Sequence, residues 1–139
     1  MEKVLIDSDI ILDVATGREP FTIDSTSVLS LIECGYAIGT VSSNSVTNIY
    51  YILRKLSSGE KARNFLRTLL EYVSVISVSH EAIRKALDSK FTDFEDGVQH
   101  FCALENRCDT IITKNGNDYA FSEIEILEPR EFVLLFDNT

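Results

Sequence analysis

Short apolar runs alternate with amphipathic segments along nearly the whole chain, and this alternation limits the possible fold more than any other feature. Five runs have the length and composition of buried strands: Lys3–Ile6, Tyr36–Val41, Val73–Val78, Thr110–Thr113 and Ile124–Leu127. Helical spacing predicts helices over Asp9–Thr16, up to Gly35, from Ser42 or Ser43 to Leu56, around Phe65–Leu70, over Glu81–Leu87, from Asp93 to Asn106 and from Pro129 onward. Strands that alternate with helices predict a three-layer α/β sandwich, with a mostly parallel central sheet of about five strands and helices on both faces.

Length and composition favour one domain that spans residues 1–139. The chain has 139 residues, of which 45% are hydrophobic, which is enough to bury a core. Its apolar runs are far shorter than a membrane span, and no secretory signal is recognised, so we expect no membrane partner. The three cysteines show no paired spacing, and Cys34 and Cys102 are interpreted as small buried apolar residues. These features favour a cytoplasmic protein.

The charge distribution is uneven along the chain. Thirteen basic residues against 22 acidic ones give a net charge of −9, which on average repels nucleic acid. Residues 54–90, however, carry eight bases against four acids. An anionic partner is therefore expected to approach through this segment, although a solvated helix face explains the same residues equally well.

Three aspartates are predicted to lie near one edge of the sheet. In open α/β sheets, ligands bind outside the carboxyl ends of the strands. Asp7 ends the first strand, Asp96 lies in the helix that precedes the fourth strand, and Asp118 follows that strand. Carboxylates held together favour a bound cation, and oxygen ligands without His or Cys favour Mg²⁺. The matching chemistry is phosphodiester hydrolysis, for which Thr113 and Asn115 are candidates to position ligands or water.

Each aspartate also has a purely structural interpretation. Asp7 is suited to cap the following helix, Asp96 follows Asp93 at the spacing of a capping box, and Asp118 lies in a turn beside Gly116. The convergence of all three on one expected crevice favours the metal-binding interpretation.

Three motifs together resemble the PIN-domain ribonucleases, in particular the VapC-like toxins of bacterial toxin–antitoxin pairs. They are V-L-I-D-S-D-I-I-L-D (Val4–Asp13), D-F-E-D-G-V-Q-H-F-C-A-L (Asp93–Leu104) and I-I-T-K-N-G-N-D-Y (Ile111–Tyr119). The resemblance implies that Asp7, Asp96 and Asp118 bind the metal. It further implies dependence on Mg²⁺ or Mn²⁺, an RNA substrate, a homodimer and often an antitoxin partner.

One element of the family pattern is missing. Family members commonly carry a Glu in the helix after the second strand, and Asn48 occupies the matching place. An amide oxygen can bind a cation or hold a water molecule, but it adds no negative charge. Asp9, Asp13, Asp93 and Glu95 are nearby candidates for compensation. The alternative is a weak or inactive relative that binds RNA or protein.

A second enzyme class shares the first motif. Residues 4–9, V-L-I-D-S-D, also resemble the first motif of haloacid-dehalogenase-type phosphatases, in which the first Asp is the nucleophile and the second is an acid. The later lysine and the G-D-x-x-x-D acid pair of that class are not found, so this interpretation ranks below the ribonuclease.

Overall fold

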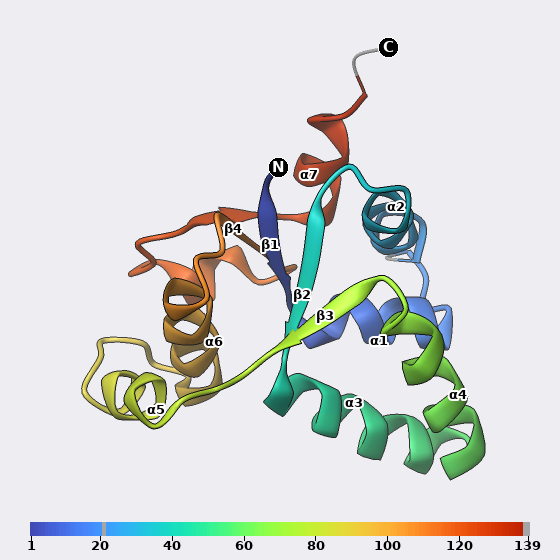
Figure 1. Cartoon of the computed structure of the whole chain (residues 1–139), viewed down its shortest axis with the longest axis horizontal. Coiled ribbons are helices and arrows are strands. Elements are labelled where there is room, and N and C mark those ends of the chain that lie inside the picture. Colours follow the sequence, from blue (N-terminus) through green and yellow to red (C-terminus); the bar gives the residue numbers. More distant parts are fainter. Residues whose placement is uncertain (21, 138–139) are drawn as a thin grey trace.

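A computed structural model describes residues 1–20 and 22–137, and its centre is a five-stranded sheet (Figure 1). The strands are β1 (Lys3–Ile6), β2 (Ile38–Ser42), β3 (Val73–Ile76), β4 (Thr110–Ile112) and β5 (Glu125–Leu127). Their spatial order is β3-β2-β1-β4-β5, and every neighbouring pair is parallel. The predicted α/β sandwich is confirmed, and the sheet is parallel throughout.

The helices follow the predicted order. Within the described residues there are seven: α1 (Ser8–Thr16), α2 (Thr22–Glu33), α3 (Ser43–Leu56), α4 (Gly59–Leu69), α5 (His80–Leu87), α6 (Phe94–Glu105) and α7 (Pro129–Leu134). A short 3₁₀ turn, η1 (Gly116–Tyr119), follows β4. Ser42 caps α3 by accepting a hydrogen bond from the Ser45 N–H, and Asp93 caps α6 by accepting one from the Asp96 N–H. Both helices therefore begin at the capping residues that the sequence predicts.

Two predicted strands extend two residues beyond the observed ones at one end, for local reasons. The second was expected from Tyr36, but the Tyr36 N–H donates to the Leu31 carbonyl and Gly35 has a φ of 88°, so the chain is still closing the end of α2. The third was expected to reach Val78, whose N–H donates to Ser43 Oγ rather than to a neighbouring strand.

The two faces of the sheet bury separate apolar clusters. Val4 and Ile6 point to one face, which α1–α4 and α7 cover, whereas Leu5 points to the other, which α6 covers. All three side chains are completely buried. This alternation gives the three layers (Figure 1). Cys102 and Cys108 lie in the core beneath α6, but Cys34 is exposed, so the expectation that Cys34 is buried is wrong.

The connectivity reverses at the centre of the sheet. The chain starts in β1, moves outward through β2 and β3, and then returns to β4 on the other side of β1. Such a switch point opens a crevice at the carboxyl ends of the two central strands, and Asp7 directly follows β1 at this place. Among the described residues, no helix is both long and apolar enough to span a membrane.

Candidate metal centre

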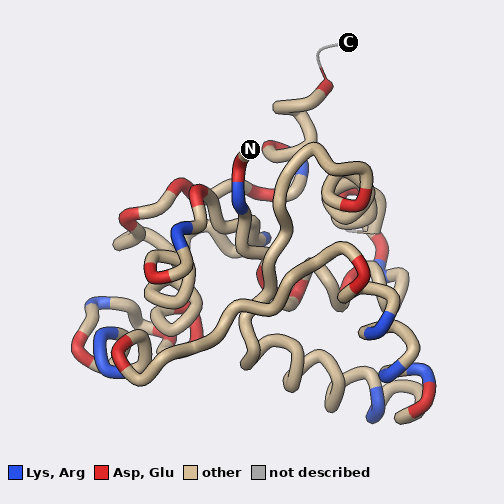
Figure 2. Tube along the Cα trace, in the orientation of Figure 1, with Lys and Arg blue, Asp and Glu red and all other residues tan. Residues whose placement is uncertain are grey.

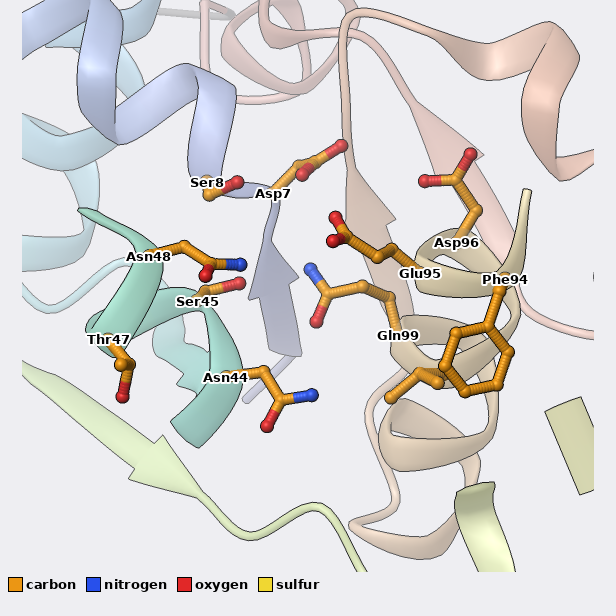
Figure 3. A pocket seen from close by; sticks show the side chains of 11 residues that line it. Asp7, Ser8, Asn44, Ser45, Thr47, Asn48, Phe94, Glu95, Asp96 and Gln99 are labelled. Carbon is orange, nitrogen blue, oxygen red and sulfur yellow. The ribbon is translucent and has the colours of Figure 1, made fainter. Parts of the chain in front are cut away.

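A cavity of about 350 Å³ lies beside the end of β1, between the first turns of α3 and α6 (Figure 3). The α3 wall is formed by neutral polar side chains: Asn44, Ser45, Thr47 and Asn48. The α6 wall carries Phe94, Glu95, Asp96, Val98 and Gln99, and Asp7 and Ser8 complete the lining. Two of the three predicted acids, Asp7 and Asp96, thus share one pocket.

Asp7 is held by a side chain from the neighbouring strand rather than by a helix cap. It occupies the N-cap position of α1, but its side chain makes no capping hydrogen bond. Instead its Oδ2 accepts a hydrogen bond of 2.8 Å from Thr113 Oγ1. Burial raises the pKa of Asp7, the Thr113 hydrogen bond opposes that change, and the nearby charge of Asp9 adds to it. Contacts with the main-chain N–H groups of Ser8 and Asp9 also lower this pKa, so the carboxyl faces the start of α1 without forming a regular cap.

Asp96 has the most perturbed carboxyl in the pocket. Its main-chain N–H donates to Asp93 Oδ1, so Asp93 does the capping and the Asp96 side chain is left to face the pocket. The pKa of Asp96 is raised to about 7. Burial is the largest cause, and the negative charges of Asp93, Asp7 and Asp118 add to it. Asp7 and Asp118 are thus close enough to Asp96 to raise its pKa.

Asp118 stands apart from the other two. It lies exposed in η1, where its N–H donates to the Asn115 carbonyl, and it does not line the pocket. Its buried neighbour Tyr119 faces Asp96, and the Tyr119 hydroxyl makes no well-formed hydrogen bond with described residues. In the part of the chain that the structure describes, no three Asp, Glu, His or Cys side chains are close enough to form a metal centre as they stand.

The remaining predicted residues have different placements. Asn48 lies on α3 and faces the pocket across from α6 (Figure 3). Thr113 is completely buried and links two segments, because its Oγ1 donates to Asp7 and accepts from the Asn115 N–H at 3.1 Å. Asn115 therefore contributes through its main chain, and its side chain is not part of the pocket lining.

Among the polar pocket residues that sequence reasoning missed are Asn44 and Gln99. Both lie four residues from a residue that was noticed: Asn44 precedes Asn48 on α3, and Gln99 follows Glu95 on α6. Residues four apart share one face of a helix, so this spacing is the signal that could have found them.

The basic segment at residues 54–90 does not form one surface. Figure 2 shows its cations in two groups, one at α4 and the adjoining end of α3, the other at α5 on the opposite side of the molecule. A shallow hollow between α3 and α4 is lined by Tyr50, Tyr51, Arg63 and Arg67, among others, and shares Thr47 with the acidic pocket. The hollow beside the α4 group thus adjoins the acidic pocket at Thr47.

Comparison with known proteins gives a consistent picture. Residues 3–117 match the family model for the PIN domain. Similar solved structures include VapBC2 from Rickettsia felis bound to a promoter DNA fragment (15% identity, TM-score 0.70, 91% of this chain and 98% of that chain). A toxin–antitoxin complex from Klebsiella pneumoniae (18%, 0.68, 91% and 97%) and the sarcin–ricin loop cleaving toxin VapC20 of Mycobacterium tuberculosis (12%, 0.67, 88% and 97%) are also similar. No curated protein matches the sequence at a significant level.

Proposed function

This chain belongs to the PIN domain family, whose members are typically nucleases, and we propose that it is a metal-dependent endoribonuclease that hydrolyses RNA phosphodiester bonds. The observation that carries the proposal is the pair Asp7 and Asp96, which line one pocket at the switch point of the sheet and both have a raised pKa. Carboxyls with raised pKa values in a cleft are typical of functional sites, because such an arrangement is unfavourable without a partner of opposite charge.

The donor atoms at this place fit a hard divalent cation. Asp7, Asp96 and Asp118 offer carboxylate oxygens, so we propose that they hold Mg²⁺ or Mn²⁺, with the Asn48 amide on the opposite wall. When bound, such a cation supplies positive charge to the scissile phosphate and makes a water molecule easier to deprotonate.

The residues of the chain itself orient this site. Thr113 fixes the direction of the Asp7 carboxyl, and the Asn115 N–H fixes Thr113 in turn. On the opposite wall, the amides of Asn44 and Asn48 have N–H groups that can donate to phosphate or sugar oxygens of RNA. The neutral α3 wall is therefore the side on which a polyanion can approach without repulsion.

The similar structures support the choice of substrate and partners. The M. tuberculosis protein is described as a toxin that cleaves the sarcin–ricin loop, and the R. felis and K. pneumoniae structures are toxin–antitoxin complexes. By this likeness we propose an RNA substrate, an antitoxin partner, a homodimer and a cytoplasmic place of action. Exposed apolar side chains on α3 and at the end of α4 suit such contacts: Tyr51 (58% exposed), Leu56 (66%) and Leu70 (40%).

The two apolar clusters lie on the two faces of one sheet, which supports a single domain over residues 1–139.

A second candidate function is kept because of Asn48. A PIN domain without the family's Glu at this position can bind RNA or a protein partner and leave it uncut. The phosphatase interpretation is weaker, since the later lysine and the acid pair of that class are not found in the sequence.

The test compares three single substitutions that each convert Asp to Asn. Purified wild-type protein, Asp7→Asn, Asp96→Asn and the control Asp88→Asn, which changes an exposed acid at the end of α5, are incubated with mixed RNAs and Mn²⁺. Cleavage is expected to fall by at least a hundredfold in the two pocket variants and to remain in the control. Equal cleavage by all four proteins would identify a contaminating nuclease, and RNA binding without cleavage by the wild type would favour the second candidate.

A further inference from the structure

The two helices that face each other across the pocket are unequally charged. Every pocket residue from α3 is neutral, including Asn48, whereas α6 contributes the acids Glu95 and Asp96 (Figure 3). A site built on Asp7, Asp96 and Asp118 alone holds three formal negative charges. Any fourth charge must therefore come from an acid other than the residue at position 48.

Three of the four acids near the pocket are already engaged or turned away. Asp9 does not line the pocket. Asp13 is completely buried and pairs with Lys114 Nζ at 2.7 Å and with Arg18 Nε at 3.9 Å. Asp93 accepts the capping hydrogen bond of α6. None of these three carboxylates lines the pocket, whereas Glu95 does.

Glu95 is the remaining acid, and its side chain points into the pocket. Figure 3 shows its carboxylate directed away from α6, toward Asp7 and across from Asn48. Within the described residues it makes no hydrogen bond and no ion pair, and it belongs to the exposed residues. Its oxygens are therefore free to bind a cation that also contacts Asp7.

The neighbouring Gln99 independently points to a ligand at the same place. It lies one turn after Glu95 on α6, its residue is only 7% exposed, and its amide extends into the pocket (Figure 3). This amide makes no hydrogen bond to any described residue. The amide is open to the pocket, so a ligand or an ordered water bound there can satisfy it.

We propose that Glu95 supplies the fourth carboxylate of the metal site, so that the negative charge absent from position 48 on α3 is provided from α6. The proposal rests on the proposed function. Gln99 lies beside Glu95 as a neutral donor and acceptor that holds a water or a phosphate oxygen next to the cation. The metal site is accordingly centred nearer to α6, and Asn48 faces the substrate.

The experiment measures Mn²⁺ binding to the metal-free full chain by calorimetry, at constant pH and without RNA. Glu95→Gln is compared with Glu60→Gln, a matched control because Glu60 is an exposed acid in the first turn of α4, as Glu95 is in α6. We expect Glu95→Gln to lower the Mn²⁺ affinity at least tenfold and Glu60→Gln to stay within twofold of the wild type.

A double variant tests whether charge is what Glu95 provides. Asn48→Glu/Glu95→Gln moves one carboxylate across the pocket, and we expect it to recover affinity to within threefold of the wild type. A wild type that binds Mn²⁺ no better than Glu95→Gln overturns the role of Glu95 and leaves the ribonuclease proposal standing. A double variant as weak as Glu95→Gln also overturns that role. A wild type that binds no Mn²⁺ overturns both proposals.

Discussion

At the scale of single residues, Asp96 is the pocket carboxyl whose pKa is changed most by its surroundings. Its pKa lies at about 7 because it is partly buried and because Asp93, Asp7 and Asp118 add negative potential. An unfolded chain imposes neither condition, so the carboxyl then has its ordinary pKa of 3.8. The difference makes the stability of the metal-free protein depend on pH.

The sign of this dependence follows from the direction of the shift. A raised pKa in the folded state means that Asp96 favours folding while it is protonated. This contribution is complete below about pH 4 and is lost as the pH rises through about 7. We expect the melting temperature of the wild type in EDTA to fall between pH 5 and pH 8, and millimolar Mg²⁺ at pH 8 to restore it. Thermal unfolding followed by circular dichroism measures both effects.

The control for this prediction is Asp96→Asn, which keeps the shape of the side chain and cannot ionise. His100 has a lowered pKa because it is buried, so it favours folding at high pH, in the opposite direction. His100 is present in both proteins, and its effect cancels in their difference. Parallel melting curves across the pH range for wild type and variant would contradict the role assigned to Asp96.

At the scale of secondary-structure elements, β2 and α2 approach closely at Gly39. A Cβ atom at this position would lie 2.6 Å from Cγ2 of Ile32 on α2. Ile32 is 4% exposed and is stiff at χ1, so it has little room to yield. We expect Gly39→Ala to lower the free energy of unfolding by about 1–3 kcal/mol, as overpacked cores do. Urea titration gives the value.

Gly59 provides the matched comparison. It is the first residue of α4, and a Cβ there would meet only the Tyr50 hydroxyl at 3.4 Å. Gly59→Ala is expected to leave stability unchanged or to raise it by up to about 1 kcal/mol, because alanine favours helix. Equal urea midpoints for the two alanine variants would mean that Gly39 is not needed for the contact between β2 and α2.

The elements were more predictable from sequence than the pocket. The spacing of apolar residues along the chain distinguishes a strand from a helix without knowledge of the fold. The caps at Ser42 and Asp93 depend only on residues next to them in sequence, so these caps were predictable too. The ends of β2 and β3 were not, because the hydrogen bonds of Tyr36 and Val78 decide them. Gln99 was missed for another reason: a polar residue on a helix looks the same whether it faces solvent or a pocket.

At the scale of the whole molecule, the net charge of −9 has to be reconciled with the proposed RNA substrate, which is itself anionic. The two basic groups at α4 and α5 lie on opposite sides, and only the α4 group adjoins the pocket through Thr47. A strand of RNA that reaches the acids is therefore expected to lie over α4. The measurable consequence is in the salt dependence of binding, since each phosphate contact contributes about 0.7 to the slope for single strands.

We expect charge reversal on α4 to flatten this slope and the same change near α5 to leave it unaltered. The variants are Lys61→Glu/Arg63→Glu/Arg67→Glu and Arg84→Glu/Lys85→Glu/Lys90→Glu, each in the Asp96→Asn background so that RNA is not cut. Filter binding at several salt concentrations should show a decrease of up to about 2 in the first slope. The opposite ranking of the two variants would place the RNA path on the α5 side.

The sheet order β3-β2-β1-β4-β5 has a consequence during protein synthesis. Asp7 leaves the ribosome early, attached to the central strand, whereas the helix with Asp96 and the turn with Asp118 emerge only after three strands have already been made. A nascent chain that stops before α6 contains three of the five strands and one of the proposed ligands, Asp7. The proposed metal site therefore cannot form until the last third of the polypeptide has been made.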